Sequence, residues 1–504
     1  MPISAFQKSL IFGVVLVFIF SSSFLVLWSL VGSQPLGHDE AVYLTEARSW
    51  IENAPADEFG IYRPIGMPGF AWFILQLTDS EKDVRMFGVF FSAITLVFLF
   101  LLFQRTASLW VALATVLLVG TSPLFLREAP NFLNDIPSAG MLFAALWLLW
   151  RYYKTAGQSK AIYIAAPFTA LAFYLRYGAA ASLGVIGIMS ALILFPKFVN
   201  KEGSAFPPLG KTIAFFILLM LPHLIQAFQV YGNPTGILTK SASAAGREYL
   251  GQGLIDFIQW LPYTLAGPLV GAAAITGVIV TFVILFRKNL RQNHEGLLWL
   301  GAIGIGVFFL TGLLIHAEPR YVFFPVALLS GVGISGIYML LEHKPKILHA
   351  GFMALIMLTT LPFAAIHYQQ TDTFFRAKEQ DRLRNVYVQA SEIIHNDSIQ
   401  EKSGCAVWAI TTYRPAVSWY SECNTLKVAD PQTFRKQLPS HQTKTMYSIV
   451  RTTSRDPQIT PENAENFGVS LTEIFRGAGE DVIVYRINYQ KPGVPQYIPN
   501  QAGD

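Results

Sequence analysis

Apolar runs long enough to cross a bilayer recur along the first 370 residues, and they restrict the chain to a membrane fold. A transmembrane helix needs about 20 predominantly apolar residues. We expect about eleven such spans, near residues 10–31, 84–104, 108–126, 134–153, 160–176, 177–196, 211–230, 263–286, 296–315, 320–341 and 347–367. The composition agrees, because only 14% of the residues are charged, against about 25% in soluble domains. The sequence therefore predicts a polytopic α-helical membrane protein.

Charged residues between the spans indicate the orientation of the chain. Basic residues gather in alternate segments, as they do on the cytoplasmic side of membrane proteins: Lys8, Arg105, Arg151, Lys154, Lys160, Lys197, Lys201, Lys211, Arg287, Lys288, Arg291, Lys344 and Lys346. The first long loop, residues 32–83, is instead acidic. We therefore expect a cytoplasmic N-terminus, with this loop and the C-terminus extracytoplasmic. The net charge of +5 reflects this topology, and we expect no nucleic-acid partner.

The first span has two interpretations, a cleaved signal peptide or an uncleaved anchor. Lys8 precedes the span and three consecutive serines interrupt it at residues 21–23. The run is longer than the apolar region of a typical signal peptide, and further spans follow it. These features favour the uncleaved anchor.

The first loop begins with His38, Asp39 and Glu40, shortly after the first span. Two adjacent carboxylates repel each other, so one of them holds a proton more readily. Such a pair suits a general base or the ligands of a divalent cation, and its structural alternative is a solvated helix start. Apolar residues with helical spacing continue to Ile51, which predicts a short helix along the membrane surface. Residues 64–78 are broken by proline and glycine and are too short to span, so we expect a second interfacial or re-entrant segment there.

Polar residues recur at the span ends that this topology places outside: Arg127, Glu128, Asn131, Asn134, Asp135, Arg176, Tyr177, His316, Glu318, Arg320 and Tyr321. An ionisable group at the membrane rim is costly without a partner, which makes it a functional candidate. Guanidinium groups bind phosphate through two parallel hydrogen bonds, so these arginines suit a phosphate-linked substrate. The structural alternatives are snorkelling anchors for the arginines and a helix N-cap region for Asp135.

From about residue 369 the apolar runs shorten and charge rises, which indicates a separate small α/β domain over residues 369–504 after a transmembrane part over residues 1–368. Strands are expected at 406–411, 445–451 and 482–487, and helices at 375–394, 431–437 and 461–467. The two cysteines, Cys405 and Cys423, both lie in this tail. They show no metal-site spacing, and an oxidising compartment would permit a disulfide between them.

Five local patterns, in this order, resemble the C-type membrane glycosyltransferases, in the branch that contains the protein O-mannosyltransferases and the lipid A aminoarabinose transferase. They are Asp-Glu-x-x-Tyr after the first span (Asp39, Glu40, Tyr43), the proline-rich segment 63–68, Asn-Asp-x-Pro (Asn134, Asp135, Pro137), the basic turn Arg176-Tyr177-Gly178, and Arg-Tyr-x-x-x-Pro (Arg320, Tyr321, Pro325). The resemblance covers roughly residues 10–345. Arg63 and Arg176 stand where the family commonly has lysine.

The resemblance implies inverting transfer of a sugar from a polyprenyl-phosphate donor to a glycan, lipid or protein acceptor at the outer face of a prokaryotic plasma membrane. Asp39 would be the catalytic base, and Glu40 would position the acceptor or a divalent cation, which some members use. Arg176, with Arg63 and Arg320, would hold the donor phosphate. Tyr43, Asp135 and Tyr321 complete the expected substrate-binding set.

Two other functions remain open from the residues. A transporter or flippase of lipid-linked sugars would also have many spans and rim arginines, although the repeated halves and interrupted helices of such proteins are not visible here. In a third, non-catalytic interpretation, the tail domain is tethered to the membrane to bind cell-wall material.

Overall fold

The computed structural model describes residues 5–32, 34–52, 63–78, 80–194, 196, 206–244, 249–261, 266–341, 344–400, 404–409, 413–428, 430–437, 444–479 and 481–489. The chain divides into two compact units, and each is described by itself. The first unit takes residues 1–32 and 61–375, and the second takes residues 33–60 and 376–504. Residues 33–60 of the first loop are thus grouped with the C-terminal part of the chain. The boundary near residue 369 stays a prediction about folding domains.

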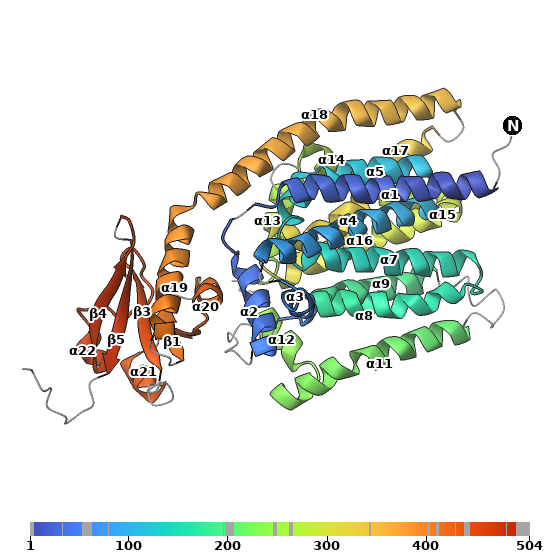
Figure 1. The fold of residues 1–504 in the computed structure, drawn as a ribbon. Helices are drawn as coiled ribbons and strands as arrows, with labels where there is room; N and C mark the ends of the chain where they lie inside the picture. The colour runs from blue at the N-terminus through green and yellow to red at the C-terminus, as the bar shows by residue number, and fades with distance from the viewer. Residues whose placement is uncertain are drawn as a thin grey trace, which may run out of the picture. The chain divides into compact units, whose positions relative to one another are not determined.

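The first unit is a bundle of long helices that lie roughly parallel in Figure 1. Its helices are α1 (Ala5–Ser29), α3 (Gly66–Leu75), α4 (Glu81–Thr106), α5 (Leu109–Gly120), α6 (Pro123–Glu128), α7 (Asp135–Lys154), η2 (Lys160–Ile164), α8 (Ala165–Leu175), α9 (Ala179–Ile193), α11 (Phe206–Tyr231), α12 (Gly236–Ala244), α13 (Gln252–Trp260), α14 (Pro268–Phe286), α15 (Lys288–Asn293), α16 (Glu295–Leu314), η5 (Pro319–Val322), α17 (Phe323–Met339) and α18 (Lys346–Glu379).

Each span expected from the sequence is helical over most of its length. Within the described residues, seven helices are long and apolar enough to cross a membrane: 9–29, 81–106, 207–231, 268–286, 295–314, 319–339 and 347–379. The expected spans at 108–126, 160–176 and 177–196 form shorter apolar helices, and the one at 134–153 is α7, which carries Asp135, Arg151 and Lys154. The segment expected at 64–78 contains α3, also a short apolar helix.

Small residues let the central helices approach closely. Gly277 of α14 faces the backbone of Leu329 in α17, and Gly333 of α17 faces the carbonyl of Ala273 in α14, so a methyl group at either glycine would overlap the neighbouring backbone. Membrane helices associate largely through such close packing, because lipid gives no hydrophobic drive toward their contact. The glycines therefore allow α14 and α17 to pack with their backbones in direct contact.

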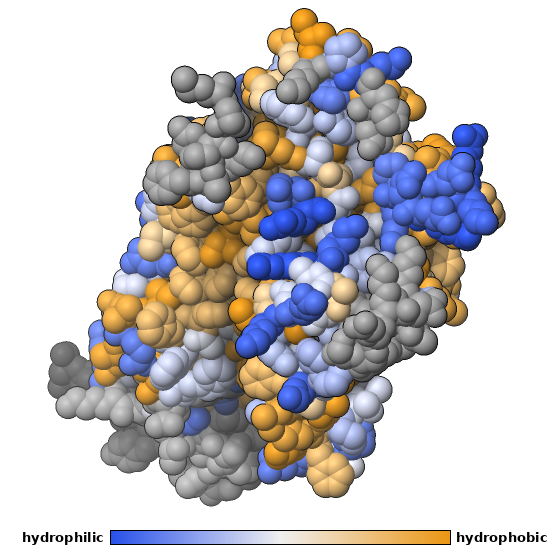
Figure 2. All heavy atoms as spheres, turned by 90° about the vertical axis from the view of Figure 1, so that its right-hand side faces the viewer, coloured by the Kyte–Doolittle hydropathy of each residue, from blue (hydrophilic) through white to orange (hydrophobic). Residues whose placement is uncertain are grey.

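One end of the bundle carries basic side chains. Arg105 lies in the last turn of α4, Arg151 and Lys154 lie in the last turn of α7, and the Trp150 indole donates to the Arg105 carbonyl at 3.2 Å. Tyr153 donates a hydrogen bond to Glu295 at the start of α16, so these ends lie together. Figure 2 shows hydrophilic residues collected amid apolar ones on this face. This basic end agrees with the alternation of loop charge in the sequence.

The C-terminal part of the second unit is a five-stranded mixed sheet in the order β2-β1-β3-β5-β4. Its strands are β1 (Cys405–Ala409), β2 (Asn424–Lys427), β3 (Thr445–Arg451), β4 (Val469–Arg476) and β5 (Val482–Tyr489). β1 pairs in parallel with β2 and β3, whereas β5 pairs antiparallel with β3 and β4. The unit also has α2 (His38–Glu52), α19 (Arg382–Gln400), α20 (Arg414–Ser421), α21 (Pro431–Gln437) and α22 (Ala464–Phe467).

Strand residues alternate between two cores, one on each face of this sheet. Val407 and Tyr447 pack with α19 and α20 on one face, whereas Trp408 and Met446 pack with Phe434 and the α22 region on the other. The period of two is what a sheet covered on both faces requires. This arrangement confirms the small α/β fold expected from the sequence.

Several element boundaries in this unit differ from the sequence prediction. The single helix predicted over 375–394 is wrong, because α18 ends at Glu379 and α19 begins at Arg382. The Asp381 carboxylate accepts hydrogen bonds from the backbone N–H groups of Leu383 and Arg384, as an N-cap does. Strands β2 and β4 and helix α20 were not predicted. β2 has only four residues, which is too short to show a clear alternation in the sequence.

Asp397 of α19 ties that helix to the sheet. It accepts a hydrogen bond from the Tyr447 hydroxyl at 2.7 Å and pairs with the Arg486 guanidinium at 2.5 Å. Burial alone would raise the pKa of Asp397, but the hydrogen bonds from Arg486 and Tyr447 and the charge of Arg486 together lower it below its usual value.

Cys405 and Cys423 form a disulfide across a sequence separation of 18 residues. Cys405 is the first residue of β1, and Cys423 lies two residues after the end of α20 at Ser421. Closing a loop of this length stabilises a folded domain by about 3 kcal/mol, through the entropy removed from the unfolded chain.

Replacing both cysteines by serine is expected to lower the apparent melting temperature of the full-length protein in detergent. The physical reason is the lost constraint on the unfolded chain. Intact-mass analysis under non-reducing conditions provides the control. Two alkylatable thiols in the untreated protein would contradict the disulfide.

Candidate active site

A buried carboxylate joins two arginines at one end of the bundle. Asp135 is the first residue of α7, and its side chain is only 3% exposed. Its Oδ1 lies 2.9 Å from Nε of Arg176, and its Oδ2 lies 3.6 Å from Nε of Arg320. Each carboxylate oxygen thus has its own guanidinium. Segments that contain residues 135, 176 and 320 therefore meet at one carboxylate, although the first and last are 185 positions apart in the sequence.

Aromatic and acidic side chains extend this cluster. The Tyr321 ring lies 4.7 Å from the Arg176 guanidinium carbon and 5.5 Å from that of Arg320. Arg320 donates from Nε to Oε2 of Glu318 at 2.6 Å, and the other Glu318 oxygen lies 3.3 Å from Nε2 of His316. The side chains of Arg176 and Arg320 keep 18% and 14% exposure. The arginines are thus held in place while part of each remains accessible.

Polar side chains at the start of α7 explain why Arg176 ends α8 at this point. The Asn134 amide donates to the Leu175 carbonyl, and the Ser138 hydroxyl donates to the Ala172 carbonyl, both at 2.9 Å. The last carbonyls of a helix lack partners within it, so Asn134 satisfies the Leu175 carbonyl. The Ala172 carbonyl already accepts from the Arg176 backbone N–H at 3.1 Å, and Ser138 adds a second bond to it. Arg176 then leaves the helix in an extended conformation, with φ −150° and ψ 117°. In the Asn-Asp-x-Pro pattern, the asparagine fixes the backbone and the aspartate fixes the guanidinium.

The proline-rich segment lies against the same helix end. Gly66 begins α3, and a methyl group there would come within 2.6 Å of the Tyr174 carbonyl oxygen and 3.0 Å of the Leu175 Cα. This close approach is possible only for glycine, because the opposing atoms are backbone. Arg63 precedes α3 by three residues and is half-buried. The approach of α3 to α8 thus brings the segment that contains Arg63 toward the residues just before Arg176.

Replacing Gly66 by alanine is expected to lower the free energy of unfolding by about 1–3 kcal/mol, the usual cost of overpacking against backbone atoms. Thermal unfolding in detergent measures the loss. Gly69→Ala is the matched control on the same helix, because nothing lies within 4 Å of a methyl group there. Equal unfolding free energies of the two variants would contradict the close contact of Gly66 with the end of α8.

The paired carboxylates of the first loop lie in the second unit, at the start of α2. Glu40 is buried, and its Oε2 accepts a hydrogen bond from the Gly37 N–H at 3.0 Å. This bond satisfies a backbone group at the helix start, so Glu40 has a structural role there. Asp39 is half-buried. Tyr43, one turn further on, is 1% exposed.

The predicted site residues therefore form two described groups. Asp135, Arg176, Arg320 and Tyr321 come together in the first unit, which also holds Arg63. Asp39, Glu40 and Tyr43 lie together on α2 in the second unit. The functional assignment of all these residues stays a prediction. Arg127, which the sequence grouped with the other rim arginines, lies with its guanidinium carbon 4.1 Å from the Phe374 ring.

Glu318 and Arg85 make structural contacts that the sequence did not indicate. Glu318 was noted only as a rim residue, but its Oε2 lies 2.6 Å from both Nε and Nη2 of Arg320, closer than the 3.6 Å between Asp135 and the same Nε. Arg85 of α4 is 1% exposed and reaches the Gly32 carbonyl at 3.4 Å, just after α1. Arg85 belongs to the charged run 81–85, which would ordinarily be assigned to the protein surface. Its position inside the predicted span 84–104 could have indicated burial, because an arginine within a span is costly without a partner.

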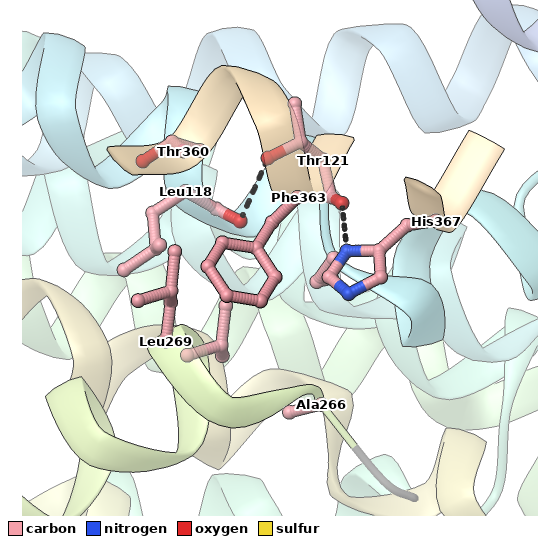
Figure 3. A pocket seen from close by; sticks show the side chains of 9 residues that line it. Leu118, Thr121, Ala266, Leu269, Thr360, Phe363 and His367 are labelled. Carbon is pink, nitrogen blue, oxygen red and sulfur yellow. Dashed lines mark hydrogen bonds between the residues drawn. The ribbon is translucent and has the colours of Figure 1, made fainter. Parts of the chain in front are cut away.

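A pocket elsewhere in the bundle contains none of the predicted site residues. It lies among α5, α14 and α18 and is lined mainly by apolar side chains, with Thr121, Ser122, Thr360 and His367 as its polar members. Figure 3 shows the His367 ring pointing at the Thr121 carbonyl, 3.0 Å from its Nδ1. This bond ties α18 to the end of α5 and accounts for the buried histidine. Among the residues described, no three His, Cys, Asp or Glu side chains gather as a metal site would require.

Comparisons with known proteins identify similarities in sequence and in fold. Residues 62–225, which include Arg63, Asp135 and Arg176, match the dolichyl-phosphate-mannose-protein mannosyltransferase family. No protein of curated function matches the sequence.

Three solved structures are similar to this chain in fold. ArnT from Cupriavidus metallidurans in the apo state has a TM-score of 0.65 at 12% identity, over 93% of this chain and 97% of that chain. The same protein bound to undecaprenyl phosphate has a TM-score of 0.63 at 12% identity, with the same coverage. The apo oligosaccharyltransferase of Archaeoglobus fulgidus has a TM-score of 0.62 at 11% identity, over 96% of this chain and 75% of that chain.

The shared fold covers more than nine-tenths of the chain, and the family match covers the segment in which Asp135 pairs with Arg176. The described helices include seven of spanning length and apolarity. The fold class predicted from the sequence is confirmed. The chain is an integral membrane protein with the C-type glycosyltransferase fold.

Proposed function

We propose that this protein is an inverting glycosyltransferase that moves a sugar from a polyprenyl-phosphate donor to a glycan, lipid or protein acceptor. The observation that carries the proposal is the Arg176–Asp135–Arg320 cluster within a C-type glycosyltransferase fold. The similar structures support the donor class, since ArnT was solved with undecaprenyl phosphate and the archaeal oligosaccharyltransferase AglB with dolichol-phosphate and an inhibitory peptide.

The arginine cluster suits the phosphate of such a donor. A guanidinium has five N–H donors in a fixed fork, and the ion pair with Asp135 engages the Nε edge of Arg176. The terminal nitrogens of Arg176 would bind the phosphate oxygens, with Arg320 and Arg63 adding positive charge. Because Asp135 and Glu318 already hold two of the guanidiniums, little reorganisation is needed when negative charge develops on the leaving group. Tyr321 would lie beside the bound phosphate.

Asp39 is proposed as the general base. Its carboxylate would take the proton from the acceptor nucleophile, which then attacks the anomeric carbon of the sugar. The bond from that carbon to the phosphate oxygen breaks, and polyprenyl phosphate leaves toward the arginines. Attack opposite the leaving group inverts the anomeric configuration. This mechanism requires the base and the arginines to lie on opposite sides of the sugar, which is a prediction about how the two units assemble.

The roles proposed for Glu40 and Tyr43 follow from their positions on α2, close to Asp39. Glu40 and Tyr43 would maintain the start of α2 around Asp39, because both are buried and Glu40 bonds the Gly37 backbone. A divalent cation, if the protein uses one, would be bound by Asp39 and Glu40 together with the substrate. Carboxylate oxygens are the ligands that Mg²⁺ and similar hard cations prefer.

We propose that the site faces the outside of a prokaryotic plasma membrane. The bundle end with Arg105, Arg151 and Lys154 would then be cytoplasmic, in accord with the positive-inside rule. The disulfide between Cys405 and Cys423 supports an oxidising compartment for the C-terminal part.

Purified protein in lipid nanodiscs tests the proposal against the transporter alternative. The protein is incubated with polyprenyl-phosphate sugars and a panel of glycan, lipid and peptide acceptors, and release of free polyprenyl phosphate is measured by mass spectrometry. A transferase releases the lipid phosphate and glycosylates an acceptor with inverted configuration. Movement of intact lipid-linked sugar across liposomes, without cleavage, would instead establish a flippase.

A further inference from the structure

Helix α2, which carries Asp39, is fastened to α20 of the same unit by Arg48. The Arg48 side chain donates from Nη1 to the Trp419 carbonyl at 2.8 Å and from Nη2 to the Ser418 carbonyl at 2.9 Å. Its guanidinium carbon also lies 4.4 Å from the centre of the Trp419 ring. Arg48 is 8% exposed. This arginine of the first loop is therefore bound to a helix more than 360 residues later in the chain.

The contact exploits the end of a helix. Ser418 and Trp419 lie in the last turn of α20, where the helix dipole favours a positive charge. The Ser418 carbonyl also accepts from the Glu422 backbone N–H at 3.1 Å, so Arg48 is its second donor. The Glu422 carboxylate, just beyond α20, lies 3.6 Å from Nη1 of Arg48 and 3.7 Å from Nδ1 of His395 on α19. One guanidinium thus meets two carbonyls, a ring and a carboxylate at the same place.

A second contact fixes the other end of α2. The Leu36 backbone N–H, two residues before the helix, donates to the Tyr420 hydroxyl at 3.1 Å. Two anchors on either side of Asp39 leave α2 little freedom to shift or rotate relative to α20.

α20 is itself held to the sheet. The Cys405–Cys423 disulfide connects β1 to the residue that follows Glu422. The Ser418 hydroxyl donates to the Cys423 carbonyl at 3.1 Å, and the Ser421 hydroxyl accepts from the Cys423 N–H at 3.2 Å. α2 is therefore connected through α20 to a covalently closed part of the C-terminal domain.

We infer that Arg48 is a positioning residue for the base Asp39, acting by locking α2 onto α20 of the C-terminal domain. The inference rests on the proposed function of Asp39, but the anchoring itself does not. Displacement of a catalytic group by about 1 Å costs up to about 10²-fold in rate. Because the arginine cluster lies in the first unit, we expect donor binding to be unchanged when this contact is removed.

The test compares Arg48→Ala, Arg48→Lys and the control Arg384→Ala in the full-length protein. Arg384 lies on α19 of the same unit, where its ion pair with Asp381 is local in sequence. Hydrogen–deuterium exchange of residues 38–52 measures the anchoring without any activity. Steady-state transfer assays then give kcat and the KM for the donor.

Arg48→Ala is expected to speed amide exchange in α2 and to lower kcat by about 10–100-fold, with the KM for the donor unchanged. Arg48→Lys restores part of kcat, because an ammonium still donates to one of the two carbonyls. Arg384→Ala matches the wild type in both measurements. Unchanged exchange in Arg48→Ala would overturn the anchoring. Faster exchange with wild-type kcat would overturn the positioning role. A rise in the KM for the donor as large as the fall in kcat would also overturn it. Faster exchange in a protein whose wild type transfers no sugar would refute the proposed function and leave the anchor standing.

Discussion

Replacing Asp39 by asparagine is expected to lower the rate of sugar transfer by about 10²–10⁴-fold, the usual contribution of a general base. The amide keeps the shape of the side chain but accepts no proton from the acceptor. Because the arginine cluster is untouched, the dissociation constant for polyprenyl phosphate is expected to stay at its wild-type value. Product formation and lipid binding, measured on the same preparation, separate the two effects.

Glu46→Gln provides the matched control for this experiment. Glu46 lies on the same helix, two turns after Asp39, and its carboxylate accepts a hydrogen bond from the Trp50 indole. The substitution makes the same change from carboxylate to amide, and transfer is expected to remain near the wild-type rate. Wild-type activity in Asp39→Asn would remove this residue from the mechanism.

Replacing Arg176 by alanine is expected to weaken binding of polyprenyl phosphate by about 30-fold or more, which corresponds to at least about 2 kcal/mol for truncating one partner of a buried charge pair. The loss has two physical sources. The phosphate loses a charged donor, and Asp135 loses the guanidinium that lies 2.9 Å away. Arg176→Lys keeps the charge without the planar fork, so we expect intermediate affinity.

Arg127→Ala is the control for the arginine series. Arg127 also ends a helix of the bundle, but its guanidinium lies over the Phe374 ring. Its removal is expected to leave lipid phosphate binding unchanged. Equal losses in the Arg127 and Arg176 variants would mean that binding responds to overall positive charge, and would contradict a specific site at Asp135.

Many helices and some strands could be predicted from the sequence, because they depend on residues that are close together in the chain. The long apolar runs became helices α1, α4, α11, α14, α16, α17 and α18, because a helix satisfies all the backbone hydrogen bonds of one segment within itself in lipid. The predicted strand over 445–451 and the predicted helix over 431–437 appear with the same bounds as β3 and α21. In contrast, β2 and β4 were missed. β2 has only four residues, and such a short strand draws its stability from neighbours in the sheet. β4 has mixed polar and apolar residues and only partial burial, so it gave no clear apolar signal.

The candidate site also has a part that could be predicted from the sequence and a part that could not. Asn134-Asp135, Arg176 and Arg320 stood out separately, because charged and polar groups at span ends are costly without a purpose. That Asp135 pairs with both arginines depends on how α7, α8 and η5 pack. Arg48 stood out as a charged residue close behind Asp39, but its partners could not be predicted. They are two backbone carbonyls more than 360 residues later in the chain, and the sequence does not show which carbonyls a guanidinium will reach.

The sequence by itself determined that the chain spans a membrane, which span ends are charged, and that a small α/β part follows. These features depend on composition and on periodicities of a few residues. Only the tertiary structure decided that Gly66 lets α3 touch the end of α8, that Asp135 is shared between two guanidiniums, and that α2 belongs with the C-terminal unit. The physical reason is that such contacts join segments tens to hundreds of residues apart, and their geometry is set by the packing of whole helices.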